Sequence, residues 1–213
     1  MGYRWHERLT RRSSGIHAAW HFWFAVSFGG EGGLRKVGLC GIHPLTQRYV
    51  YGGCVAIWQF SVVLIPASWA EENSYSSSSL YGDEGYDTAC AWKGRQPVFD
   101  FTVVFDDILP SSKSWDRELL VWGNEKEHDI QVWYDGEAVE SMHIRLDLNY
   151  ELHEIINKVI KAAIALDCVL FLPEFKSVVM ASEFELKHAI KKSNAAKFIR
   201  DTKVFFNNIR EKT

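Results

Sequence analysis

The chain has 213 residues, enough for one ordinary domain or for one domain with an appendage. Hydrophobic residues make up 47% and charged residues 24% of the sequence, a balance typical of a soluble globular protein. This composition excludes wholesale disorder, a collagen-like fibre and a multi-span membrane protein. The formal net charge of -3 does not favour a general nucleic-acid binder, and four cysteines do not make a disulfide scaffold.

The charge is unevenly distributed along the chain. Up to Ala56 there are seven Lys and Arg against two acidic residues, a net charge of +5, and ten of the 15 glycines. The other 157 residues hold 17 basic and 25 acidic side chains, a net charge of -8. We therefore expect residues 1–55 to form a basic, weakly ordered N-terminal extension and residues 56–213 to form a single domain.

Three other interpretations of the N-terminal part need weighing. A signal peptide is disfavoured because His17 and His21 interrupt its apolar region and no clear cleavage site follows. The uncharged run 49–70 is long enough for a membrane anchor, but two glycines, a glutamine and a proline interrupt it. The third interpretation is that residues 20–27 and 55–65 are buried strands, and the composition favours it for the second run.

The first half of the domain predicts short elements. Residues 55–65 are rich in Val, Ile, Phe and Trp and predict a strand closed by Pro66. Residues 68–71 match a capping box and predict a short helix, and the polar residues 73–85 predict a surface loop. Residues 98–105 alternate and predict a strand, and residues 115–122 predict a short helix ended by Gly123.

A hairpin over residues 129–148 is the strongest strand prediction. Apolar residues alternate on both sides of Asp135-Gly136, a pair that favours a tight turn with positive φ. The alternation changes phase between Val139 and Met142, which predicts a β-bulge near residues 140–141.

The rest of the domain is mainly helical. Residues 152–164 carry one apolar stripe of period 3.6, namely Leu152, Ile155, Ile156, Val159, Ile160, Ala163 and Ile164. Residues 168–172 predict a buried strand, and helices are expected over 182–190, 193–199 and 201–209. The sequence therefore predicts an α+β fold with two layers: a mainly antiparallel sheet, a long amphipathic helix and a helical C-terminal part.

Metal chemistry finds little support in the residue spacing. His153-Glu154 begins like a zinc-protease helix, but the position that needs the second histidine holds Asn157. Cys40, His43 and Cys54 supply three zinc ligands, whereas a structural site needs four. We therefore expect no metal and no cofactor.

Nucleophilic chemistry is weakly supported as well. Cys168 with His188 as its base is one arrangement, but Cys168 begins an apolar run that favours a buried, inert thiol. Arg145 and Asp147 share one face of a strand, where an ion pair between them is the default interpretation.

Surface features are what remains for function. The middle of the chain is rich in acidic residues and tryptophans, which are usually solvated faces and core residues, respectively. The alternative is a protein-binding surface with aromatic anchors in an acidic field. Its candidate contacts, chosen by composition, are Asp106, Asp107, Trp115, Asp116 and Glu125.

A resemblance extends over residues 57–210. It is carried by segments 64–71 (LIPASWAE), 108–115 (ILPSSKSW) with Trp122-Gly123, 134–137 (YDGE), 144–147 (IRLD) and 193–201 (SNAAKFIRD) before Phe205-Phe206. Together these segments resemble small bacterial immunity proteins encoded beside polymorphic or Rhs-type toxins. The resemblance does not extend to the first 55 residues, which depart from the short N-terminus usual in that family.

The resemblance implies a cytoplasmic protein without enzymatic activity that binds and neutralises a cognate protein toxin by stoichiometric occlusion. It implies neither a nucleic-acid partner nor a membrane span. Two alternatives stay open: a small hydrolase that reverses a toxin's modification, and a non-catalytic regulatory or scaffold domain. A Cys168–His188 pair within hydrogen-bond reach would favour the hydrolase.

Overall fold

The structure, a computed structural model, describes residues 56–82 and 85–202. These residues all belong to one compact unit of the chain. The predicted N-terminal extension and nearly all of the helix expected over 201–209 lie outside the described residues, so both stay predictions.

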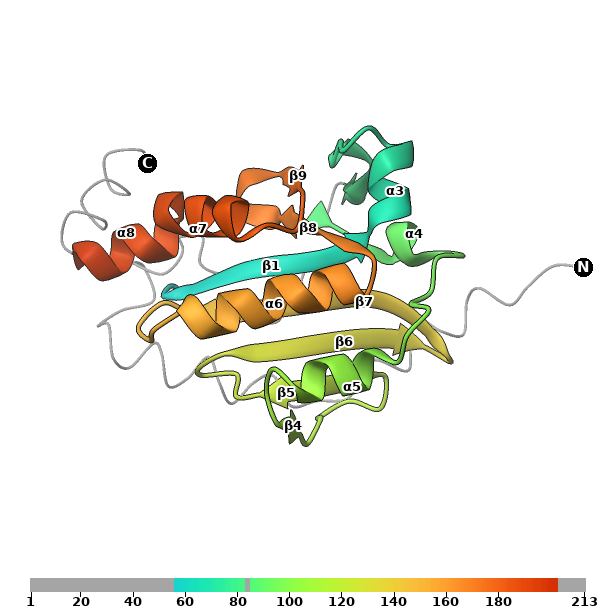
Figure 1. Cartoon of the computed structure of the whole chain (residues 1–213), viewed down its shortest axis with the longest axis horizontal. Coiled ribbons are helices and arrows are strands. Elements are labelled where there is room, and N and C mark those ends of the chain that lie inside the picture. The colour runs from blue at the N-terminus through green and yellow to red at the C-terminus, as the bar shows by residue number, and fades with distance from the viewer. Residues whose placement is uncertain (1–55, 83–84, 203–213) are drawn as a thin grey trace, which may run out of the picture. The chain divides into compact units, whose positions relative to one another are not determined.

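One antiparallel sheet organises the described residues (Figure 1). Its strand order is β4-β5-β6-β7-β1-β8-β9, and every neighbouring pair runs antiparallel. The strands are β1 (Gln59–Pro66), β4 (Ser111–Ser112), β5 (Leu119–Gly123), β6 (Asp129–Asp135), β7 (Ala138–Asp147), β8 (Cys168–Leu172) and β9 (Ser177–Val179). A separate two-stranded sheet pairs β2 (Tyr81–Gly82) with β3 (Gly85–Tyr86). The predicted α+β class with a mainly antiparallel sheet is confirmed.

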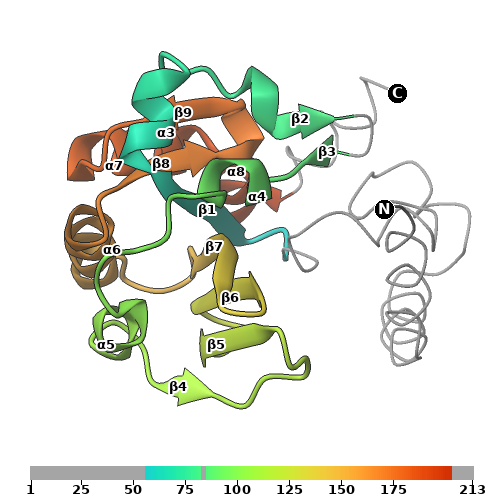
Figure 2. The ribbon, with the colours of Figure 1, turned by 90° about the vertical axis from the view of Figure 1, so that its right-hand side faces the viewer.

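The helices are α3 (Ala67–Glu72), α4 (Ala89–Trp92), α5 (Phe101–Asp106), α6 (His153–Ala165), α7 (Glu183–Lys192) and α8 (Asn194–Arg200), with 3₁₀ helices at Ser78–Leu80 and Pro173–Phe175. Figure 2 shows α5, α6 and α7 on the same side of the large sheet. Side chains from this helical layer and from alternate positions of β1, β6, β7 and β8 form the larger apolar core. The sheet and its helices therefore make the two predicted layers.

Helix α6 and strand β8 follow from their patterns. Five residues of the predicted α6 stripe are buried: Ile155, Ile156, Val159, Ile160 and Ala163. The prediction that Ile164 belongs to the buried stripe is wrong. Its side chain is 64% exposed, because the buried face of the helix includes Ala162 instead. All five residues of β8 are buried, as expected of a strand between two neighbours.

The β6–β7 hairpin is confirmed together with its irregularity. Gly136 has a φ of 66°, as a tight turn of this kind requires. Trp133 pairs with Ser141 while Tyr134 pairs with Val139, so Glu140 is the extra residue of a bulge. The bulge lies where the change of apolar phase predicted it.

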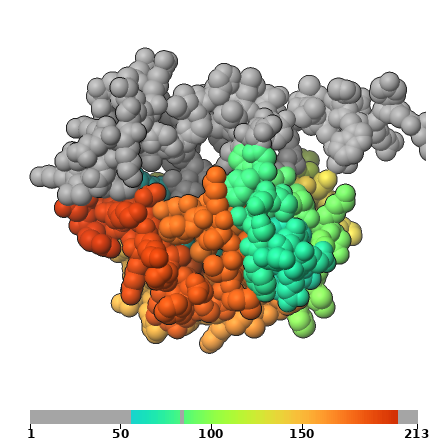
Figure 3. Space-filling model, turned by 90° about the horizontal axis from the view of Figure 1, so that it is seen from above, coloured from blue at the N-terminus to red at the C-terminus, as the bar shows by residue number. Residues whose placement is uncertain are grey.

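A smaller apolar core lies on the other side of β1 and β8. Val63 and Ile65 of β1 meet Val169 and Phe171 of β8 there, together with residues of α3, α4 and the β2–β3 hairpin. Figure 3 shows the segment around α3 packed against the C-terminal half of the chain. The predicted loop 73–85 therefore holds a 3₁₀ helix and strand β2 and helps to cover one end of the sheet.

Two predicted elements have the wrong type. Residues 98–105 were expected as a strand, but Phe101–Asp106 form helix α5. Residues 115–122 were expected as a helix, but Leu119–Gly123 form β5, paired with β6. Both segments are short, and a short apolar run does not by itself distinguish a helix from a strand.

The helix caps give a mixed outcome. Ser182 accepts a hydrogen bond from the backbone N–H of Glu185 and begins α7 as predicted, and Ser193 caps α8 in the same way. Helix α3 forms, but it begins at Ala67 after Pro66, without a side-chain cap, so the predicted role of Ser68 is wrong. Among the described residues, no helix is both long and apolar enough to cross a membrane.

Candidate functional site

Helix α5 carries two of the predicted contact residues, Asp106 and Asp107, and both are exposed. The Asp106 carboxylate accepts a hydrogen bond of 2.7 Å from the indole Nε1 of Trp122 in β5. The carbonyl oxygen of Asp107 accepts one of 2.9 Å from Nζ of Lys158 in α6. Asp106 therefore ties α5 to the sheet, while the Asp107 carboxylate faces solvent.

Trp115 and Asp116 lie in the turn before β5. The Trp115 ring is 58% exposed and meets the Trp133 ring edge to face, with 5.4 Å between the ring centroids. The Asp116 carboxylate accepts a hydrogen bond of 2.9 Å from the backbone N–H of Glu118 and so shapes the turn. Trp115 is the large aromatic side chain that the prediction placed at the surface.

Glu125 lies in the connection between β5 and β6. Its side chain is exposed, and its carbonyl oxygen accepts a hydrogen bond of 3.0 Å from Nε2 of Gln59 in β1. The five predicted residues thus occupy three separate places: the end of α5, the turn before β5 and the β5–β6 connection. The structure does not bring them together in one cluster.

A row of buried polar side chains crosses the sheet face opposite α5 and α6. These residues alternate along their strands with the apolar residues of the larger core, so they point to the other side of the sheet. They are Gln59 of β1, Asp129 and Gln131 of β6, and Ser141, His143, Arg145 and Asp147 of β7. The sequence analysis singled out only Arg145 and Asp147 among them, because alternation alone does not tell whether a polar face is covered.

An ion pair forms the centre of this row. Nε and Nη2 of Arg145 donate to the two carboxylate oxygens of Asp129, its direct partner across β6 and β7. Nε2 of Gln131 donates a third hydrogen bond of 3.0 Å to the same carboxylate. Arg145 therefore pairs across the strands with Asp129, and the expected pair with Asp147 is wrong.

His143 and Ser141 lie beside this pair on β7. Nε2 of His143 and Oγ of Ser141 are buried and have no hydrogen-bond partner, so the two groups are not bonded to each other. Burial, with a smaller effect from the Arg145 charge, lowers the pKa of His143 to about 3. The ring of Tyr86 in β3 stacks on the His143 ring with 6.1 Å between centroids. His143 is therefore a neutral, enclosed imidazole, and it has no hydrogen bond to activate Ser141 as a nucleophile.

His128 and Asp147 close one end of the row. Nδ1 of His128 accepts a hydrogen bond of 3.0 Å from the backbone N–H of Asp147. The Asp147 carboxylate accepts hydrogen bonds of 2.8 Å from both nitrogens of Asn149, which fixes the turn after β7. Burial lowers the pKa of His128, although nearby carboxylates oppose the shift. These bonds join the β5–β6 connection to the end of β7.

The proposed Cys168–His188 pair is not assembled. Cys168 is buried, and its thiol donates to the carbonyl oxygen of Leu166 at 3.4 Å. Burial, with a smaller contribution from Asp167, raises the pKa of Cys168 to about 12. His188 is exposed and stacks on Phe184, 6.0 Å between centroids. A thiol of this kind is held in its unreactive form.

The structure bears on one of the two metal-site hypotheses, the one at His153, and does not test the other. His153 is exposed at the start of α6, and its Nδ1 lies 3.5 Å from the Glu183 carboxylate of α7. Within residues 56–82 and 85–202, no three His, Cys, Asp or Glu side chains gather closely enough to hold a metal ion. Cys40, His43 and Cys54 lie outside the described residues, so nothing here tests that combination.

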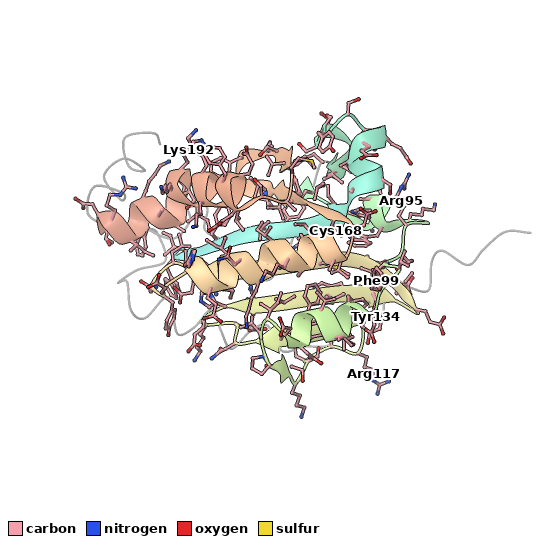
Figure 4. All side chains as sticks on the ribbon, viewed as in Figure 1. Arg95, Phe99, Arg117, Tyr134, Cys168 and Lys192 are labelled. Carbon is pink, nitrogen blue, oxygen red and sulfur yellow. The ribbon has the colours of Figure 1, made fainter. Side chains whose placement is uncertain are left out.

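Sequence reasoning missed three exposed apolar side chains on α5 and in the segment before it. Val98, Phe99 and Val103 are 90%, 66% and 67% exposed (Phe99 is labelled in Figure 4). They were missed because the strand predicted over 98–105 would have buried alternate residues in a core. Asp100, a residue type favoured at helix N-caps, was the available signal.

Comparison with known proteins gives no relative on which to base a function. No protein-family model, curated protein or solved structure matches this chain. The functional argument therefore depends on the chain's own residues.

Proposed function

We propose that this chain is a cytoplasmic immunity protein that binds a cognate bacterial toxin and neutralises it by stoichiometric occlusion. The proposal combines the resemblance of residues 57–210 to such proteins with the surface chemistry of the domain. It assigns the chain a partner protein and no reaction of its own.

The observation that carries this proposal is the concentration of acidic charge beside exposed apolar groups. Residues 57–150 contain 17 acidic and six basic side chains, whereas residues 151–202 contain seven acidic and eight basic. The acidic segment includes the exposed side chains of Asp106, Asp107, Trp115 and Glu125. An acidic field around exposed aromatic and aliphatic groups suits recognition of a basic protein surface.

The resting state of the buried groups is consistent with a binding protein. The thiol of Cys168 is protonated and hydrogen-bonded, His143 is neutral, and the Arg145 and Asp129 charges neutralise each other. These groups stabilise the sheet and its surroundings, which leaves the exposed surface as the part available to a partner. A rigid sheet with a fixed helical layer also lowers the entropy lost on binding.

Co-expression tests the proposal. The product of the reading frame immediately upstream of this gene is tested as the toxin, and it is expressed from an inducible promoter in cells that do or do not contain this chain. We expect the chain to restore growth and to co-purify with an active-site variant of the toxin in a one-to-one complex. An Ile130→Asp variant, which places a charge in the larger core, serves as the unfolded control.

Two outcomes would count against the proposal. Continued growth arrest, with the chain present in soluble form, would rule out immunity towards that toxin. Restored growth without a complex, or with sub-stoichiometric amounts of this chain, would indicate an enzymatic antidote instead. The electrostatic part is tested separately, because steered association slows as salt screens the charges. An association rate that does not fall between low and high salt would contradict steering.

A further inference from the structure

Exposed apolar and acidic side chains occur together on α5 and in the segment before it. They are Val98 and Phe99 in the segment before the helix, Val103 on the helix, and the carboxylates of Asp100, Asp106 and Asp107, and we call this set the α5 surface. Its three apolar side chains are between 66% and 90% exposed. Exposed apolar side chains gathered within six residues mark an interaction surface more often than isolated ones do.

A capping hydrogen bond and aromatic packing against the core fix helix α5, which carries the α5 surface. The Asp100 carboxylate caps the helix by accepting a hydrogen bond of 2.9 Å from the backbone N–H of Thr102. Phe105 is fully buried, with its ring centroid 5.3 Å from that of Trp122. Phe101 meets the same indole edge to face at 6.4 Å. The aromatic residues on the inner side of α5 therefore pack into the core.

The outer side of α5 has no such packing. Val103 is separated from Phe101 and Phe105 by two positions each, which places it on the opposite side of the helix. Val98 and Phe99 precede the cap and extend the apolar area beyond the helix. Burial of these groups in a partner would return free energy that the folded chain alone does not gain.

The charge around these groups selects the partner. From Arg95 to Lys113 the chain holds three aspartates and two basic residues, and one of the two, Arg95, pairs with the Glu72 carboxylate. Nζ of Lys158 contacts this segment through the Asp107 carbonyl oxygen, but it also lies 3.7 Å from the Glu154 carboxylate, which offsets its charge. A twofold dimer through this surface would bring two sets of aspartates together, which opposes that arrangement.

We propose that the α5 surface docks onto a basic protein, with Phe99 and Val103 entering an apolar recess and Asp100 and Asp107 meeting lysines or arginines around it. This inference rests on the proposed function, because it names the surface with which the toxin is bound. It narrows the five contacts predicted from sequence to Asp106 and Asp107, and it adds Val98, Phe99, Asp100 and Val103.

The experiment compares three forms of the full chain in the growth-rescue assay and in binding to the inactive toxin. They are the wild type, the double variant F99A/V103A and the control F184A. Phe184 on α7 is 74% exposed and lies outside the acidic segment, so its removal matches the loss of the exposed Phe99 ring. Thermal unfolding checks that all three proteins fold, as expected for substitutions of exposed side chains.

We expect F99A/V103A to weaken toxin binding by at least about tenfold and to lose rescue, while F184A behaves as the wild type. The charge variant D100N/D107N keeps the hydrogen-bond acceptors and is expected to slow association at low salt only. Full rescue and unchanged affinity for F99A/V103A would overturn the α5 surface and leave the immunity function standing.

A wild type that neither rescues growth nor binds the toxin would remove the proposed function instead. In that case the proposal for the α5 surface is tested by panning a displayed library of random peptides on the same three proteins. Enrichment of basic peptides that bind the wild type and F184A, but not F99A/V103A, supports the surface. Three results of the panning would overturn the surface: enrichment of acidic peptides, equal binding to all three proteins, or no enrichment. Dimerisation of the wild type that is lost in F99A/V103A would overturn it as well.

Discussion

Replacing Asp129 with Asn is expected to destabilise the domain strongly. The Asp129 side chain is fully buried and that of Arg145 is 6% exposed, so the Arg145 charge cannot reach solvent when its carboxylate partner is removed. The Asn side chain is nearly the same size, but it offers one acceptor oxygen where three donated hydrogen bonds now converge. Breaking a buried ion pair on one side costs about 3–5 kcal/mol.

Urea unfolding followed by far-ultraviolet circular dichroism measures this effect. We expect D129N to lower the free energy of unfolding by about 3–5 kcal/mol with an unchanged m-value, and to lower Tm by roughly 6–20 °C. The matched control is D107N, which removes an exposed carboxylate and is expected to stay within about 0.5 kcal/mol of the wild type. High salt is not expected to rescue D129N, because a buried charge is poorly screened.

A free energy of unfolding for D129N within about 1 kcal/mol of the wild type would refute this reasoning. It would mean that groups other than Asp129 are enough to stabilise the Arg145 charge. A changed m-value would instead indicate that the native or the denatured state had become more or less compact, and the comparison would then not measure the pair.

Three further predictions concern other positions. Gly123 has a φ of 78° and an added Cβ would overlap the carbonyl oxygen of His128, so G123A should cost clearly more stability in urea than G94A, where φ is 76° and the space is open; equal costs would contradict this. His143 has a folded pKa of about 3, below its unfolded value of about 6.5, so its contribution is present above pH 6.5 and is lost as pH falls towards 3. Acidification from pH 7 to 5 should therefore cost the wild type about 2 kcal/mol more than H143L, and parallel pH profiles would exclude His143 as the cause. S182A removes the cap of α7 and should cost about 1 kcal/mol in urea unfolding, whereas no loss would show that the cap is dispensable.

Sequence periodicity determined the elements whose pattern is formed by residues close together in the sequence. The stripe on α6, the β6–β7 hairpin with its bulge at Glu140, the buried strand β8 and the cap at Ser182 follow from local spacing. Each depends on residues within a few positions of one another, so the sequence alone contains the information. The charge difference between the two parts of the domain is likewise a property of the sequence.

The short elements depended on tertiary context. Residues 101–106 alternate as a strand would, yet they form a helix, because Asp100 caps them and Phe105 finds a place against Trp122. Residues 119–123 form a strand because β6 supplies their hydrogen-bond partners from across a hairpin. In segments of five or six residues, such long-range contacts outweigh the local preference.

Tertiary structure also decided what the polar residues do. In the sequence Arg145 has Asp147 two positions away, but the antiparallel register places it directly opposite Asp129. The polar residues of β6 and β7 form a buried row, whereas Val98, Phe99 and Val103 lie at the surface although their residue types favour burial. Burial depends on which elements pack above a residue, and the spacing of that residue within its own segment does not contain this information.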